Sequence, residues 1–104
     1  MTPAQFRNLA LSLPGTSEGA HMGHTDFRAA GKIFASLGYP DADWAMVKLS
    51  PEMQEMYVAA EPTVFTPVKG AWGRRGNTNV RLAAATKAKL DGALRAAWSS
   101  VTTR

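Results

Sequence analysis

The chain has no cysteine among its 104 residues. It can therefore form no disulfide, no thiolate metal site and no thiol nucleophile, and it fits a compartment in which thiols stay reduced. No apolar run approaches the roughly 18 residues that are needed to span a bilayer. The first residues also lack the basic segment and unbroken apolar segment of a signal peptide. We therefore expect a cytoplasmic protein with no membrane contact.

Acidic residues are scarce in the last third of the chain. Residues 69–104 contain a single acid, Asp91, against eight lysines and arginines, whereas residues 1–68 contain seven acids and four basic residues. The net charge is +4. This asymmetry predicts a basic surface built from the C-terminal third, which would bind DNA or another polyanion. The alternative is a solvated basic surface that serves solubility.

Three segments begin with helix-capping residues. Thr2-Pro3 with Gln5 fits a capping box, Ser50-Pro51-Glu52 begins a second helix, and Thr86 begins a third. Each helix has one apolar stripe. We expect these stripes to be Phe6, Leu9, Ala10 and Leu13; Met53, Met56, Tyr57 and Ala60; and Leu90, Ala93, Leu94, Ala97, Trp98 and Val101.

Five segments have the composition of strands, and residues 16–19 look like a polar turn. The predicted strands are Asp26–Ala29, Lys32–Leu37, Asp43–Leu49, Thr63–Val68 and Thr78–Ala83. Pro67 cannot donate to a ladder, so the fourth strand should lie at a sheet edge. A symmetric hairpin at Ala30-Gly31 would place Phe27 opposite Phe34 and Arg28 opposite Ile33, but a shift by one residue would exchange the faces.

The order of elements predicts one domain over residues 1–104 in the α+β class. We expect a two-layer α/β sandwich of order α-β(3)-α-β(2)-α, with a mainly antiparallel five-stranded sheet and the helices on one face. The other face would then carry Trp44, Met46, Lys48, Asn79 and Arg81. An exposed sheet with aromatic and basic groups can hold stacked bases and phosphates.

The segment from Lys69 to Leu82 is the strongest candidate site. Two glycines flank Arg74-Arg75, which suits a turn that offers charge and backbone donors to an anion. Trp72 could stack on a base, although a tryptophan that covers the sheet end and donates its N–H to a carbonyl is the more common arrangement. The candidate nucleic-acid-binding residues are Lys48, Lys69, Trp72, Arg74, Arg75 and Arg81.

The remaining polar groups indicate no enzyme. His21 and His24 would point to opposite faces of a continuous strand, so joint metal binding requires a bend. His24 and Asp26 could form a base with its orienting acid, but no serine or threonine is placed to act as nucleophile. Lys87 and Lys89 sit at the unfavourable end of a helix dipole, where a phosphate would relieve the mismatch. We expect no catalytic residues, no metal and no cofactor.

Several short motifs, in this order and spacing, resemble the MmcQ/YjbR family of small bacterial proteins. They are Leu13-Pro14-Gly15, Gly23 to Arg28, Gly31 to Ala35, Val47-Lys48-Leu49, Gly70-Ala71-Trp72-Gly73 with Gly76, and Ala97-Trp98. The resemblance implies a two-layer fold similar to frataxin-like and secretion-chaperone-like domains. Proteins of this family are usually described as DNA-binding, so the resemblance also implies DNA binding. It implies no catalytic residues, and it implies packing roles for Phe27, Lys32, Phe34 and Trp72.

The leading hypothesis is a non-enzymatic nucleic-acid-binding module that contacts mainly the phosphate backbone. The first alternative is a protein-interaction or chaperone-like module that uses the Trp44/Met46 side of the sheet and forms a stable homodimer or binds an acidic protein partner. The sequence does not decide between a monomer and a homodimer. The second alternative is a small-anion binder that uses the turn at residues 73–77.

Overall fold

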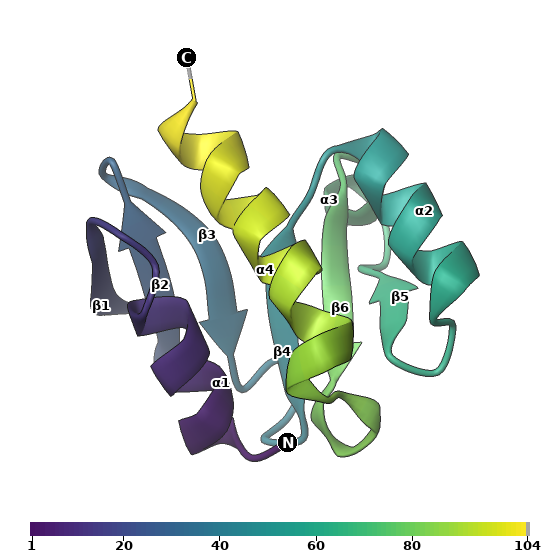
Figure 1. Ribbon diagram of the computed structural model, residues 1–104, viewed down its shortest axis with the longest axis horizontal. Helices are drawn as coiled ribbons and strands as arrows, with labels where there is room; N and C mark the ends of the chain where they lie inside the picture. Colours follow the sequence, from purple (N-terminus) through teal and green to yellow (C-terminus); the bar gives the residue numbers. More distant parts are fainter. Residues whose placement is uncertain (104) are drawn as a thin grey trace.

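The computed structural model describes residues 1–103 and combines one sheet with three long helices and one short helix (Figure 1). The elements are α1 (Pro3–Leu11), β1 (Thr16–His21), β2 (His24–Ala29), β3 (Lys32–Leu37), β4 (Trp44–Lys48), α2 (Pro51–Ala60), β5 (Phe65–Pro67), α3 (Ala71–Arg74), β6 (Asn77–Arg81), a 3-10 turn (Leu82–Ala84) and α4 (Lys87–Thr102). The predicted capping box is present, because Thr2 and Gln5 each accept a hydrogen bond from the other's backbone N–H. The caps at Ser50 and Thr86 are also confirmed.

The sheet has six strands in the order β1-β2-β3-β4-β6-β5, and every neighbouring pair is antiparallel. The prediction of five strands is wrong because residues 16–21 form β1 rather than a polar turn. This strand lies at an edge and has no buried residue, so it carries none of the apolar alternation that marks a half-buried strand. The prediction that the Pro67 strand lies at an edge is confirmed, since β5 pairs with β6 alone.

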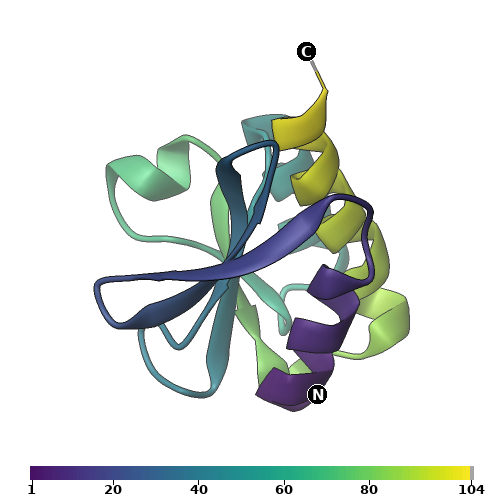
Figure 2. The ribbon, with the colours of Figure 1, turned by 90° about the vertical axis from the view of Figure 1, so that its left-hand side faces the viewer.

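The three long helices cover one face of the sheet, as expected. Seen along the sheet, α1 and α4 lie on one side, and α3 projects on the other side together with the tip of the β1–β2 hairpin (Figure 2). The short helix α3 is thus the exception to the predicted arrangement. We call the sheet face opposite α1, α2 and α4 the open face.

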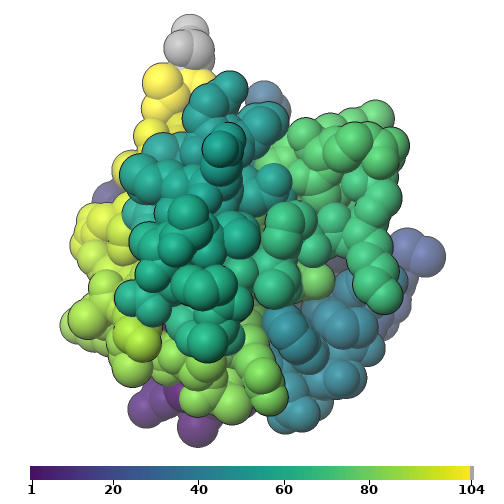
Figure 3. Space-filling model, turned by 90° about the vertical axis from the view of Figure 1, so that its right-hand side faces the viewer, coloured from purple at the N-terminus to yellow at the C-terminus, as the bar shows by residue number. Residues whose placement is uncertain are grey.

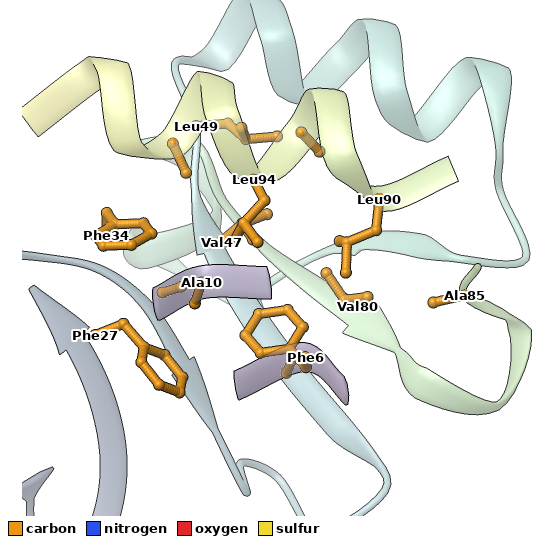
Figure 4. Packing of buried hydrophobic residues seen from close by; sticks show 14 of the residues in the cluster. Phe6, Ala10, Phe27, Phe34, Val47, Leu49, Val80, Ala85, Leu90 and Leu94 are labelled. Carbon is orange, nitrogen blue, oxygen red and sulfur yellow. The ribbon is translucent and has the colours of Figure 1, made fainter. Parts of the chain in front are cut away.

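The core lies between the sheet and the long helices. Phe6 of α1, Phe27 of β2 and Phe34 of β3 are fully buried there, and Leu90 and Leu94 of α4 pack above the sheet (Figure 4). The stripe predicted for α4 is confirmed, with Trp98 half-buried at its margin. Burying an aromatic ring of this kind contributes roughly 2–3 kcal/mol.

The hairpin of β2 and β3 combines the predicted register with an irregularity. Arg28 pairs with Ile33 as expected, but Phe27 pairs with Ala35, because a bulge follows Phe27 on the ladder. The extra residue, Phe34, lets both phenylalanines enter the core. Packing therefore overrides the symmetric pairing.

The stripe predicted for α2 is partly wrong. Met53 and Tyr57 pack against the core, but Met56 is half exposed, Ala60 is exposed, and Val58 takes part in their place. The helix packs over the sheet margin near β5 and contains no fully buried residue. A helix in this position needs a narrower apolar stripe than one that crosses the centre of the sheet.

Candidate nucleic-acid interface

The segment between β5 and β6 contains a helical turn, α3, where the sequence indicates only a loop. Gly73 is buried in this turn, and a Cβ on it would lie 1.7 Å from the carbonyl oxygen of Val68. Gly76 has φ +105°, and a Cβ there would lie 2.0 Å from the carbonyl oxygen of Leu49. The expected positive φ is thus found at Gly76, while Gly73 is needed for close backbone approach.

Side-chain amides hold α3 in place. Gln54 of α2 donates from its amide nitrogen to the carbonyl oxygens of Gly73 (3.0 Å) and Asn77 (2.9 Å). Asn77, itself buried, donates from Nδ2 to the carbonyl oxygen of Trp72 at 3.0 Å. The carbonyls of Trp72 and Gly73 also accept the backbone N–H groups of Arg75 and Gly76. The side-chain amides are additional hydrogen bonds, which give the turn a defined backbone position.

Trp72 lies on this turn with 62% of its surface exposed. The expectation that it covers the sheet end is therefore wrong, and so is the packing role that the family resemblance implies. Arg75 lies over its ring, with Cζ 5.2 Å from the ring centroid, which is a cation–π geometry. The indole is presented to solvent beside a guanidinium group.

The segments that carry four of the predicted cations, Lys48, Lys69, Arg74 and Arg75, meet around this turn. Lys48 pairs with Asn77 across β4 and β6, and the N–H of Val68, next to Lys69, donates to the Asn77 carbonyl. All four of these basic side chains are exposed. We use the name α3 surface for these four cations together with Trp72; it comprises Lys48, Lys69, Trp72, Arg74 and Arg75. In the space-filling view the segment around α3 projects beside α2 (Figure 3).

Arg81 does not join this set. It lies at the other end of β6, four residue steps or about 13 Å from Asn77, and pairs with Trp44 on the open face. Asp43 precedes Trp44, and its carbonyl accepts a hydrogen bond from the N–H of Leu82, the residue after Arg81. An acidic residue therefore lies close to Arg81. The predicted site is thus split into a cluster of four cations and one separate arginine.

The acids of residues 1–68 leave the α3 surface uncompensated. Among residues 1–103, the salt bridges join Arg7 with Glu18, Arg28 and His21 with Asp26, Lys89 with Glu61, and Arg95 with Asp91. None of them includes a cation of the α3 surface. Lys89, one of the two lysines at the unfavourable N-terminal end of α4, is paired with Glu61 at 3.5 Å.

A second polar cluster lies on the open face around Asp26. Its carboxylate is fully buried and accepts hydrogen bonds from Arg28 Nε (2.7 Å) and Nη2 (3.1 Å), and it lies 2.8 Å from His21 Nδ1. The Arg28 hydrogen bond holds the pKa of Asp26 below its usual value, against the opposing effect of burial. The partner of Asp26 is therefore His21 rather than His24, whose ring instead meets Tyr39 edge-on.

The hairpin turn explains why sequence spacing misplaced the histidines. His21 and His24 are directly opposite each other across β1 and β2, hence on the same face. Nevertheless, residues 1–103 contain no group of three metal-ligating side chains that could hold an ion. In the same part of the chain, no helix is long and apolar enough to cross a membrane.

Comparison with known proteins places the fold. The solved structure of Deinococcus radiodurans protein DR2400, a DUF419 domain, is similar with a TM-score of 0.79 and 19% identity, over 99% of this chain and 80% of that chain. No curated protein matches the chain. The model of the YjbR family matches residues 11–100. The chain therefore belongs to the YjbR family.

Proposed function

We propose that the protein is a non-enzymatic module that binds nucleic acid through the α3 surface. The observation that carries this proposal is the concentration of four exposed cations, none in a salt bridge within residues 1–103, around a solvent-facing tryptophan. Arginine forks pair with two phosphate oxygens at once, and lysines add point charges. The DNA-binding description that the family resemblance implies is consistent with this proposal.

Phosphate contacts rather than base-edge contacts should dominate. Arg74 is the last residue of a four-residue helix and Arg75 is its C-cap, and a helix this short cannot serve as a recognition helix in a major groove. The long helix α4 uses one face for the core and lies on the opposite side of the sheet from α3 (Figure 2). Binding should therefore depend strongly on salt and weakly on sequence.

A salt titration of labelled oligonucleotides tests this proposal. Neutralising about four phosphates gives an expected slope of log K against log salt of about −3.6 on duplex DNA and about −2.8 on a single strand. Replacing Arg74 and Arg75 together with alanine should reduce the slope by about 1.5 to 2 and weaken binding to all sequences alike.

Arg81→Ala is the matched control, since it removes one exposed arginine from the same face outside the α3 surface. It should weaken binding less than Arg74→Ala. The proposal fails if the wild type binds no oligonucleotide at low salt, or if the Arg74/Arg75 double variant keeps the wild-type slope.

The interaction-module alternative has less support. Trp44 and Met46 are half-buried rather than exposed, and the exposed apolar side chains Met22, Tyr39 and Met56 lie on separate elements. A protein-binding surface typically needs a contiguous apolar patch of several hundred Å². Met56 lies on α2, and Tyr39 comes near the β1–β2 hairpin only through its ring contact with His24.

A further inference from the structure

Resting on the proposed function, we infer that the α3 surface selects single-stranded over duplex nucleic acid by stacking an unpaired base on Trp72. The proposed function needs only the cations of this surface. The exposed indole is a separate feature, because phosphate binding makes no use of it. An aromatic ring beside phosphate-binding cations matches the two parts of one nucleotide.

The ring is accessible as a stacking platform. Its exposure is 62%, and Arg75 covers one ring face at 5.2 Å from the centroid. Because Arg75 lies over one face, the opposite face is the one on which a base would stack. A base that stacks there would lie opposite the guanidinium, and the phosphates on either side would lie near Arg74 and Lys69.

The backbone that carries the ring is held in place before binding. The backbone of Trp72 is held by the Asn77 Nδ2 hydrogen bond to its carbonyl, and the next residue, Gly73, is held by Gln54 and by close contact with Val68. A platform on a fixed backbone loses little conformational freedom on binding, which improves affinity. An exposed tryptophan on a loose loop would lack this advantage.

A duplex cannot use this platform, except at its ends. Its bases are stacked on one another, and their faces are hidden inside the helix. Extruding one base from a duplex costs a few kcal/mol, whereas an unpaired strand offers its base faces freely. The duplex should therefore bind through the cations alone.

The test compares three probes of equal length: oligothymidine, an abasic deoxyribose-phosphate strand and a blunt duplex. Wild-type protein should bind oligothymidine about 5- to 100-fold more tightly than the abasic strand at the same salt concentration. Trp72→Ala should remove most of this difference while keeping affinity for the abasic strand, and Trp72→Phe should retain more of it than alanine. Met22→Ala removes an exposed apolar side chain from the β1–β2 tip. It should leave the affinity for all three probes unchanged.

The outcomes separate the two proposals. Equal binding of oligothymidine and the abasic strand, unchanged in Trp72→Ala, would refute base stacking and leave phosphate binding in place. Tighter binding of the duplex than of oligothymidine would overturn the selectivity. Absence of binding to all three probes at low salt would remove both the stacking inference and the proposed function.

Discussion

At the scale of single residues, Asp26 shows how a charged group is accommodated under the surface of the open face. Its carboxylate is fully buried, yet Arg28 and His21 supply hydrogen bonds to both oxygens. Gly19, the residue opposite Asp26 on β1, provides the space for this carboxylate, because a Cβ at Gly19 would lie 2.9 Å from Oδ1 of Asp26. A buried carboxylate is stable only with such partners, because desolvation alone would favour its neutral form.

Replacing Asp26 with asparagine should destabilise the fold by about 1–3 kcal/mol near neutral pH, because hydrogen bonds to a charged group are lost. The pKa of Asp26 is lowered in the folded state from its usual 3.8. Its contribution is therefore fully present above pH 3.8 and is lost as the pH falls through the lower folded-state value. Chemical denaturation at several pH values should show the wild-type and variant stabilities converging in acid.

A constant difference between the two proteins down to the lowest pH at which both fold would contradict this account. Ser17→Ala is a suitable control, since Ser17 pairs with Arg28 at the same sheet edge but is exposed. It should leave the pH dependence of stability unchanged.

At the scale of elements, α3 owes its shape to its neighbours. Its four residues are too few to be stable as an isolated helix. The turn exists because Gln54, Asn77 and the backbone of Val68 meet it at defined points. Trp72 therefore faces solvent as a consequence of contacts made by the residues around it.

Gly76→Ala should destabilise the protein by at least about 2 kcal/mol, because φ is +105° and the added Cβ would overlap the Leu49 carbonyl. Gly15→Ala is the matched control: φ is +69°, but no atom lies within 4 Å of the added Cβ. It should cost about 1–2 kcal/mol, the strain of an alanine in the left-handed region. Urea denaturation measures both, and equal losses would show that steric overlap at Gly76 is relieved by movement.

At the scale of the whole molecule, the sheet order decides which charges act together. Because β6 inserts between β4 and β5, Lys48 is brought beside the α3 segment from some twenty residues away in the chain. The start of α4, which carries Lys87 and Lys89, belongs to the same basic third of the sequence but lies on the helical side of the sheet (Figure 1). The basic third of the chain is thus divided between two sides of the sheet, so the prediction that it builds one basic surface is wrong.

Position rather than net charge should therefore govern polyanion binding. Reversing Arg74 and Arg75 to glutamate takes the net charge from +4 to 0, and so does reversing Lys87 and Lys89. The first variant should lose at least about tenfold in affinity for oligonucleotides at moderate salt, and the second should stay within about threefold of wild type. Anisotropy titrations in one buffer would decide, and equal losses would indicate attraction by overall charge alone.

Much of the local structure could be predicted from residues near one another in the chain. The caps at Thr2, Ser50 and Thr86, the apolar stripe of α4 and the edge position of Pro67 follow from interactions across a few residues. The uneven charge and the absence of cysteine are also properties of the sequence alone. These features narrow the fold class and suggest an anionic partner.

Tertiary structure decided the features that depend on distant contacts. β1 is a strand because it adds to β2 at a free edge, His21 rather than His24 reaches Asp26 because a hairpin turns between them, and Trp72 is exposed because α3 is held from α2 and β6. It also separated Arg81 from the other cations. Each of these features depends on contacts between residues that come together only when the sheet forms. Hydrophobic periodicity and residue spacing therefore cannot predict them.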